Sequence, residues 1–563
     1  MRQKHHPMNK IFASCLLVAA GLLSFSCSNT TQDTALIDDN VLGAAETPQA
    51  TVAGGVLEGV NESGVAVFKG VPFAAAPVGD LRWKAPQPVE SWEGVLEAKE
   101  FGPNSMQQPI FGDMAFGTDV NSEDCLYLNI WTPAKSTKAK LPVFIYFHGG
   151  GLMAGSGSEP RYAGMSYARN GVVAITANYR QGVFGFLAHP ELTAETEYKG
   201  SGNYGYMDQA AAIQWVKDNI AAFGGDPDKI TIMGESAGSY SVSTLMASPL
   251  SRDNIAQAMG SSGSTLADPW PTLEEAEAAG LAMQEQLGCA DLAEMRAMPA
   301  EELLEKAAVT NMPTANIDNY FMPKQPLEIY LAGEQAQVPC LIGNNSGEMV
   351  PMMVCGPNTT IDGVKAGLTE WLGGESVDEA DVTKLLELYG FAEDADVMKL
   401  PGYAAAGDKF IVYGTWKWMD LQQANSKAPV YRYRFCKARP DLIDVNKVSA
   451  LAGGTKDKED GEESGPSAPG AFHSVDIEYQ MGTIPTTPIY AWTAEDFDVS
   501  EVFEQFFLNF IKTGNPNGLG LPHWDPINGE EVPPVMCIGL KTYQEKDADM
   551  QERYHLLDKY LAK

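Results

Sequence analysis

The chain has 563 residues, of which 44% are hydrophobic and 20% are charged, a composition typical of a globular protein rather than a disordered or fibrous one. Its formal net charge of −34 at pH 7 repels phosphate backbones, which argues against a nucleic acid partner and predicts a soluble, acidic surface. After the N-terminal region no segment approaches 18 consecutive apolar residues, so no transmembrane helix is expected.

The N-terminus has the features of an export signal, predicted to cover residues 1–27. Basic residues precede the apolar run "IFASCLLVAAGLLSF" (11–25), which is too short to span a bilayer comfortably. Cys27 resembles the lipidated cysteine of bacterial lipoproteins, although the leucine usual three positions earlier is here Ser24. We therefore expect an exported protein whose only membrane contact is a lipid anchor on Cys27, at the periplasmic or surface side of the bacterial cell envelope; a simply cleaved, periplasmic or secreted protein is the alternative.

Beyond the signal, residues 28–50 are polar and lack periodicity, which predicts a flexible tether. Folded sequence is expected to begin near Thr51 and to continue as a single domain to residue 563. Short apolar runs bounded by glycine and proline predict strands buried on both faces. These runs are "PVFIYF" (142–147), "GVVAITANYR" (171–180), "KITIMG" (229–234), "VPCLIG" (338–343) and "PVYRYRF" (429–435).

Helical periodicity appears between the second and third of these strands and again near the C-terminus. The stretch "YMDQAAAIQWVKDNIAAFGGDP" (206–227) predicts a crossover helix that stops at Gly224, and residues 500–518 predict an amphipathic helix that stops at Gly514. The order strand, helix, strand predicts an α/β fold: a large, mostly parallel twisted sheet flanked by helices on both sides, with long excursions from the sheet.

The stretch "GESAG" (234–238) is the only G-x-S-x-G pattern in the chain, and it lies between a predicted strand and a plausible helix. In this context the pattern indicates a nucleophile elbow, a strained turn that lifts the hydroxyl of Ser236 clear of the sheet. An ordinary strand-to-helix turn is the alternative, because glycine-rich chains contain such patterns by chance.

A serine hydroxyl needs a base within hydrogen-bond reach and a third group that orients the base. His473, which lies after the last predicted strand, is the best base; the other histidines lie in the signal, in the glycine loop described next, beside prolines or late in the chain (His5, His6, His148, His189, His523 and His555). Glu348 follows the predicted strand at 338–343, where a carboxylate at a strand tip is expected; a solvated loop carboxylate is the alternative. The order Ser236, Glu348, His473 is that of α/β-hydrolases.

The stretch "FHGGG" (147–151) ends a predicted strand and exposes backbone N–H groups that no side chain obstructs. Donors of this kind stabilise the oxyanion that forms during acyl transfer. We expect the donors to be Gly150, Gly151 and Ala237, the residue after the nucleophile. A phosphate-binding loop is the competing interpretation of three glycines, but no lysine follows and no dinucleotide-binding spacing is present.

These motifs resemble the type-B carboxylesterase family, which includes para-nitrobenzyl esterases, carboxylesterases and cholinesterases. The resemblance covers nearly the whole mature chain and rests on segments in the family's order: "GVAVFKGVPFAAAPVGDLRWKAPQPV" (64–89), "SEDCLYLNIWTP" (122–133), "FHGGG", "NYRQGVFGFLA" (178–188), residues 202–238, "GAFHSVDIEY" (470–479) and "FIKTGNPNG" (510–518). It implies an α/β-hydrolase fold with the catalytic and oxyanion residues named above.

The same resemblance implies supporting residues. Glu235 matches a family carboxylate that faces the substrate pocket, and Ser262 and Asp476 match a buried polar pair that supports the histidine. Leu152 and Met153 directly follow the oxyanion glycines, so we expect them to border the acyl side and to favour short acyl chains.

Six of the eight cysteines lie beyond the signal, widely scattered and without a Cys/His cluster, so no metal site is predicted. Many extracellular relatives are expected to pair the cysteine equivalent to Cys125 with one about twenty residues upstream, where this chain has Ser105. Cys289 also lacks its usual nearby partner, with Met295 in the neighbouring stretch. We expect mostly free thiols.

The expected function is hydrolysis of small-molecule carboxylic esters through an acyl-enzyme, without cofactor or metal. Because His473 must be neutral to accept a proton, activity is expected to rise through roughly pH 6 to 7.

The acidic segment 453–470, rich in glycine and proline, predicts a mobile surface loop, and its place before His473 suggests a flap at the entrance of the site; a mere insertion is the alternative. A catalytically silent adhesion or binding protein and a hydrolase of amide or thioester bonds are the alternative functions. The natural ester and the oligomeric state are not predicted.

Overall fold

The computed structural model describes residues 46–111, 114–307, 313–449, 451, 455–458 and 469–562. The predicted signal, Cys27 and most of the predicted tether lie outside these residues. All described residues belong to one unit, which spans residues 38–563. Within it, no helix combines the length and the apolar character that a membrane crossing requires.

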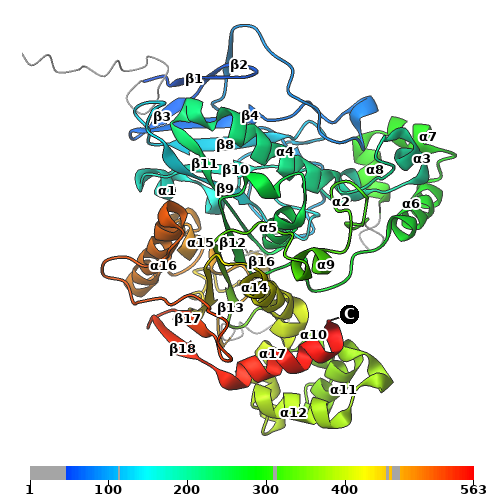
Figure 1. The fold of residues 1–563 in the computed structure, drawn as a ribbon, viewed down its shortest axis with the longest axis vertical. Helices are drawn as coiled ribbons and strands as arrows, with labels where there is room; N and C mark the ends of the chain where they lie inside the picture. Colours follow the sequence, from blue (N-terminus) through cyan, green and yellow to red (C-terminus); the bar gives the residue numbers. More distant parts are fainter. Residues whose placement is uncertain are drawn as a thin grey trace, which may run out of the picture. The chain divides into compact units, whose positions relative to one another are not determined.

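A mixed sheet of 11 strands runs through the centre of this unit, in the order β18-β17-β14-β13-β12-β11-β9-β10-β8-β4-β3 (Figure 1). The strands from β17 to β10 in this order run parallel, and β18, β8, β4 and β3 are antiparallel to their neighbours. The strands are β3 (Val60–Glu62), β4 (Val65–Pro72), β8 (Tyr127–Thr132), β9 (Leu141–Phe147), β10 (Val173–Ala177), β11 (Gly225–Glu235), β12 (Gln257–Ser261), β13 (Cys340–Asn345), β14 (Val430–Phe435), β17 (Pro534–Ile538) and β18 (Tyr543–Lys546).

The five predicted strands are β9, β10, β11, β13 and β14, all in the parallel part of the sheet. Sequence reasoning missed β12, whose small residues do not form a long apolar run. At Gly260 in β12 the reason is packing, because a Cβ there would lie 2.3 Å from the Trp418 ring. It also missed β17 and β18, so the expectation that His473 follows the last strand is wrong: His473 follows β14, and two further strands come after it.

Each parallel strand contributes side chains to a core on either face of the sheet. In β9, Val143, Ile145 and Phe147 lie in one core, and Phe144 and Tyr146 lie in the other. This alternation follows from the two-residue period of a strand. The first core includes residues of α4 (Tyr204–Asn219), α5 (Ala237–Ala247) and α14 (Tyr413–Asn425), and the second includes residues of α1 (Met165–Arg169) and α16 (Ala494–Thr513), so helices cover both faces (Figure 1).

The two predicted helices correspond to α4 and α16. The first ends, after a 3-10 turn, at Gly224 with φ of 75°, and the second ends at Gly514 with φ of 74°. α16 starts six residues before the predicted segment, because Thr493 and Asp496 form a capping box there.

Long excursions between the sheet strands contain the other helices. They are α2 (Gly182–Phe186), α3 (Pro190–Glu195), α6 (Leu273–Leu287), α7 (Leu292–Ala297), α8 (Ala300–Lys306), α9 (Pro326–Leu331), α10 (Met352–Cys355), α11 (Ile361–Leu372), α12 (Glu379–Tyr389), α13 (Leu400–Gly407) and α15 (Ile477–Gln480), and α17 (Ala548–Leu561) follows the last strand. The described chain therefore has the predicted class: a large, mostly parallel sheet with helices on both faces and long excursions.

Short strands outside the large sheet adjust two predicted boundaries. β1 (Gln49–Val52) pairs with β2 (Gly55–Glu58), which also pairs with β5 (Val95–Glu97), so regular structure starts two residues before Thr51. β6 (Asn104–Ser105) pairs with β7 (Asn121–Ser122). Within the predicted mobile loop 453–470, residues 455–457 form β16 (Thr455–Asp457), which pairs with β15 (Lys447–Ser449); residues 453–454 and 459–468 lie outside the described residues.

Candidate active site

Ser236 occupies the turn between the end of β11 and the start of α5. Its φ of 56° and ψ of −124° are strained for a residue with a side chain. Backbone segments approach so closely in this turn that residues with a side chain would collide. A Cβ on Gly234 would lie 2.2 Å from the carbonyl carbon of Gly238, and a Cβ on Gly238 would lie 2.0 Å from the Phe147 oxygen. The glycines of "GESAG" are thus required by contacts, and the geometry is that of a nucleophile elbow.

His473 and Glu348 complete a chain of hydrogen bonds that begins at Ser236. His473 Nε2 lies 2.9 Å from Ser236 Oγ, and His473 Nδ1 lies 2.8 Å from Glu348 Oε2. Glu348 follows β13 and His473 lies in the excursion after β14, so segments far apart in sequence converge at the carboxyl ends of neighbouring parallel strands. All the geometry that a base and its orienting acid need is present.

The carboxylate of Glu348 is held by two further donors. Ser262 Oγ donates to Glu348 Oε1 at 2.6 Å, and the backbone N–H of Asn345 donates to the same oxygen at 2.6 Å. Asn345 also donates from Nδ2 to Asp476 Oδ1 at 2.9 Å. Ser262 and Asp476 are both buried, as the prediction of a buried polar pair requires. Among the described contacts neither hydrogen bonds to His473: Ser262 donates to Glu348, which contacts the histidine, and Asn345, which sequence reasoning missed, links the acid to Asp476.

The glycine loop after β9 lies beside Ser236, where a Cβ on Gly149 would be 3.0 Å from Ser236 Cβ. Gly150 has φ of 106° and Gly151 has φ of 65°. Neither N–H has an acceptor among the described atoms, and Ala237 opens α5, where the first N–H groups have no partner within the helix. Three donors are thus available next to the serine hydroxyl, as an oxyanion hole requires.

A cavity of about 320 Å³ opens above Ser236. Its lining is mostly apolar, and it includes the glycine loop, Ser236 and His473: Phe111, Met114, Gly149, Gly150, Gly151, Leu152, Arg161, Tyr162, Glu235, Ser236, Ala237, Tyr240, Phe410, Ile411, Leu451, His473 and Ser474. Leu152 lines it as predicted. Met153 does not, because the chain turns back at Leu152 (φ 59°) and Met153 N–H donates to Gly150 oxygen at 3.1 Å.

Two lining residues could not be anticipated from a motif. Phe410 contacts the His473 ring edge to face, with 5.0 Å between ring centroids, and it belongs to a π-helical turn between α13 and α14. Leu451 accepts a hydrogen bond from Ser474 Oγ at 2.9 Å and lies two residues before the segment 453–470. The described chain thus lines the cavity up to Leu451, and the flap stays a prediction because residues 453–454 and 459–468 lie outside the described residues.

Glu235 places a second carboxyl group near the histidine. Its Oε1 lies 3.4 Å from His473 Nε2, and both side chains are buried. Burial of the imidazole lowers the pKa of His473, but the neighbouring carboxylates of Glu235, Glu348 and Asp476 outweigh burial and raise this pKa to about 9. Burial likewise raises the pKa of Glu235 to about 8. With such a pKa, His473 becomes neutral at higher pH than an ordinary imidazole, so the rise of activity is then expected above the predicted pH 6 to 7.

The remaining described histidines have structural contacts. His148 is buried and stacks on Tyr179, and burial lowers the pKa of its imidazole to about 4. His189 caps α3 by accepting from Glu191 N–H. Among the described residues no cluster of His, Cys, Asp or Glu could hold a metal ion, and the six described cysteines are free thiols.

The chain is similar to known proteins over most of its length. The model of the "Carboxylesterase family" matches residues 43–557. The chain is 40% identical over 396 residues to the fumonisin B1 esterase of Sphingopyxis macrogoltabida, covering 68% of this chain and 69% of that protein. It is 30% identical over 535 residues to the para-nitrobenzyl esterase of Bacillus subtilis, covering 89% and 97%. The solved structure of a Geobacillus stearothermophilus carboxylesterase superposes with a TM-score of 0.75 at 32% identity, covering 90% of this chain and 99% of that one.

Proposed function

Because the chain belongs to the carboxylesterase family and is a carboxylic ester hydrolase, we propose that Ser236, His473 and Glu348 carry out the reaction. The observation that supports this most is the unbroken set of hydrogen bonds from Ser236 through His473 to Glu348, 2.9 and 2.8 Å long, at the wall of the largely apolar cavity. Nucleophile, base and orienting acid stand in the relation that acyl transfer needs.

In the first half of the reaction Ser236 Oγ attacks the carbonyl carbon of the ester, and His473 Nε2 takes the hydroxyl proton. Glu348 accepts the hydrogen bond from the Nδ1–H of the histidine and stabilises the imidazolium. The carbonyl oxygen becomes an oxyanion, to which the N–H groups of Gly150, Gly151 and Ala237 donate. The tetrahedral intermediate then expels the alcohol, which leaves with the proton of Nε2, and the acyl group stays on Ser236.

The second half repeats these steps with water. His473 Nε2 takes a proton from water, whose oxygen attacks the acyl carbon, and the oxyanion is again held by the backbone donors. Collapse of this intermediate releases the carboxylic acid and returns the proton to Ser236 Oγ. The cavity of about 320 Å³ is near the lower end of the usual range of ligand sites, which supports small esters with short acyl chains as substrates.

The test is the variant Ser236→Ala, assayed with 4-nitrophenyl acetate and labelled with a fluorophosphonate probe. We expect kcat to fall by at least about 10⁴-fold, since removal of a triad member leaves only the oxyanion hole and binding. The unsubstituted protein is expected to take up one probe molecule on Ser236, located by peptide mass spectrometry, and the variant none. Hydrolysis by the variant at near the original rate would contradict the assignment.

For localisation, we propose export and lipid anchoring through Cys27. The support is the short apolar run that ends at this cysteine, preceded by basic residues. Expression of the full chain and of Cys27→Ser with a radiolabelled fatty acid tests the anchor: the label and recovery in the membrane fraction are expected for the first and not for the second. Equal distribution of both would leave a cleaved signal as the better description.

A further inference from the structure

One wall of the catalytic cavity contains a buried cation, Arg161. It lies in the 3-10 turn Pro160–Tyr162, it is only 5% exposed, and it lines the same cavity as Ser236 and His473. Most of the remaining side chains of the cavity are apolar or aromatic (Phe111, Met114, Leu152, Tyr162, Phe410 and Ile411). Removing a guanidinium from water is costly, so a buried arginine is expected to have partners for its N–H groups.

The protein supplies a partner for only part of this guanidinium. Arg161 Nε donates to Glu159 Oε1 at 2.7 Å, which uses one of five N–H donors. Nη1 is buried and has no hydrogen-bond partner, and Nη2 forms no hydrogen bond or ion pair with any residue that the structure describes. The N–H groups of Nη2 are therefore the donors left for a ligand, because Nη1 is enclosed by protein as well as unpaired.

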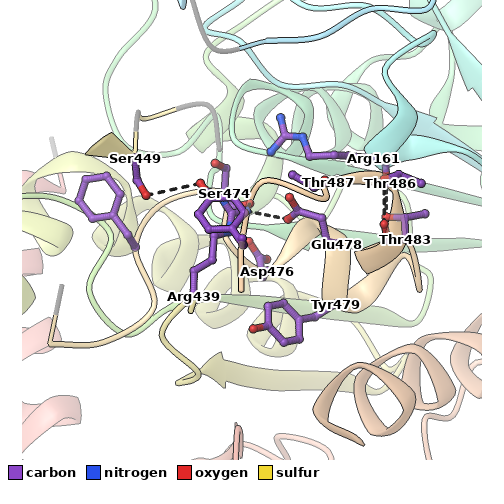
Figure 2. A network of polar contacts seen from close by, with 12 residues as sticks. Arg161, Arg439, Ser449, Ser474, Asp476, Glu478, Tyr479, Thr483, Thr486 and Thr487 are labelled. Atoms are coloured by element: carbon purple, nitrogen blue, oxygen red, sulfur yellow. Dashed lines mark hydrogen bonds and ion pairs between the residues drawn. The ribbon is translucent and has the colours of Figure 1, made fainter. Parts of the chain in front are cut away.

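The orientation of Arg161 is fixed by its surroundings. Its backbone oxygen accepts a hydrogen bond from Thr483 Oγ1 at 2.8 Å, and its guanidinium lies 5.6 Å from the centre of the Tyr162 ring. Figure 2 shows the side chain extending away from Thr483 and Thr486. Together with the contact to Glu159, these interactions hold the Nη2 donors in place before any ligand arrives, which reduces the entropy lost on binding.

Arg439, in the same polar network, shows the contrast. Its Nη2 donates to Glu478 Oε2 at 2.6 Å and its Nη1 donates to the Tyr490 hydroxyl at 3.1 Å, as Figure 2 shows for the pair with Glu478. Arg439 does not line the cavity. Of these two buried arginines, Arg161, whose outer nitrogens have no hydrogen bond to described protein groups, lines the cavity, and Arg439, whose outer nitrogens do, does not.

We propose that Arg161 binds an anionic group of the substrate, so that the enzyme prefers esters that carry a carboxylate near the scissile bond. The guanidinium N–H groups at Nη2 can donate to a carboxylate oxygen, and hydrogen bonds between charged groups are the strong ones. The proposal rests on the proposed catalytic role of Ser236 and names the class of ester that the same cavity takes.

Besides Glu478, which pairs with Arg439 at 2.6 Å, Glu235 is a nearby carboxyl group that could compete for this cation. It lines the same cavity, but no ion pair joins it to Arg161 among the described residues. Glu235 Oε1 lies 3.4 Å from His473 Nε2 instead, and burial raises the pKa of its carboxyl group to about 8.

The experiment compares esters that differ only in charge. 4-Nitrophenyl hemiglutarate and 4-nitrophenyl pentanoate place the carboxylate on the acyl side, and 4-acetoxybenzoate and 4-acetoxybenzamide place it on the alcohol side. For each pair the ratio of kcat/KM, anionic over neutral, is measured at pH 7.5 after subtraction of spontaneous hydrolysis. In Arg161→Gln we expect this ratio to fall by about 10-fold to 100-fold in at least one pair, from the loss of charge-assisted hydrogen bonds.

Three controls make the result decisive. Arg439→Gln removes a buried arginine from the same network but not from the cavity, and the ratio is expected to stay within about 2-fold of the original. Because Arg161→Gln leaves Glu159 buried without its partner, the double variant Glu159→Gln/Arg161→Gln is measured as well, with the same expected fall. Ser236→Ala is assayed in parallel.

An unchanged ratio in both pairs and both Arg161 variants would overturn the substrate preference and mean that water alone solvates the guanidinium. If hydrolysis of the neutral esters still depends on Ser236 in that case, only the anion site is refuted. If instead hydrolysis survives Ser236→Ala, the proposed catalytic role itself is refuted, so the two failures are distinguishable.

Discussion

The carboxyl group of Glu235 lies beside His473, the proposed base, and its effect on the protonation of that histidine can be measured. Its Oε1 lies 3.4 Å from His473 Nε2, in a buried site. Two unit charges at this distance interact by about 1.2 kcal/mol even at the dielectric constant of water, which corresponds to about 0.9 pKa units, and by more in a protein interior. Replacing Glu235 by glutamine removes the negative charge at nearly constant size. We therefore expect the pKa of His473 to fall by about 1 to 3 units.

The assay is kcat/KM for a chromogenic ester from pH 5 to 9.5. His473 must be neutral to act as base, so a raised pKa places the rise of activity at higher pH, and a lowered pKa moves the rise to lower pH. We expect Glu235→Gln to reach half of its maximal kcat/KM at least about 1 pH unit below the unsubstituted enzyme. Glu123→Gln, which removes a carboxylate that pairs with Arg82 away from the cavity, is the control. Coincident profiles, or a shift of the Glu235→Gln profile to higher pH, would refute the reasoning.

Four further substitutions test the site and its support. Gly150→Ala should lower kcat by about 100-fold or more, because its Cβ would lie 1.9 Å from the Ala154 oxygen. Gly151→Ala should lower kcat less, since the nearest atom to its Cβ is 3.5 Å away. Equal losses of kcat in the two variants would argue against this account of the loop. Glu348→Gln should lower kcat by about 10² to 10⁴-fold with little change in KM, which steady-state kinetics will check. Gly260→Ala should lower the free energy of unfolding by about 1 to 3 kcal/mol through contact with the Trp418 ring, measured by urea unfolding, and an unchanged midpoint would contradict it.

The parallel part of the sheet was predictable because its strands are buried on both faces and therefore read as continuous apolar runs. This holds for β9 and β11, which flank the catalytic loops. It fails for β12, where Gly260 and its small neighbours make room for Trp418, a contact that no local pattern reveals. Edge strands such as β18 are half exposed and polar, so their apolar signal is weak. The fold class and the esterase family are confirmed, whereas strand count was not predictable.

The residues of the candidate site also differ in whether the sequence could predict them. Ser236 and the glycine loop were visible because backbone strain and close approach permit few residue types. Asn345 and Arg161 were not, because their positions depend on contacts between segments more than one hundred residues apart, as in the bond from Asn345 Nδ2 to Asp476 at 2.9 Å. Sequence spacing also could not show that Ser262 contacts Glu348, or that Leu152 lines the cavity and Met153 does not.

Asn345 connects the two segments that carry the acid and the base, which leads to a last prediction. Its backbone N–H donates to Glu348, and its side chain donates both to Asp476 and, at 2.9 Å, to the oxygen of Phe472, the residue before His473. Asn345→Ala keeps the backbone bond and removes the two side-chain bonds. Burial already raises the pKa of Asp476 to about 6, and the bond from Asn345 opposes this, so the substitution should raise that pKa further and release the segment that holds His473.

We expect Asn345→Ala to lower kcat by about 10-fold, because a misplaced base reduces proton transfer, while KM changes little. Asn344→Ala is the matched control, since the side chain of Asn344 donates only to the Asn345 oxygen among the described contacts. Both variants are compared by kcat, KM and urea unfolding. If Asn345→Ala loses stability but keeps its kcat, the side chain supports the fold rather than the placement of the base, and the asparagine is no part of the catalytic arrangement.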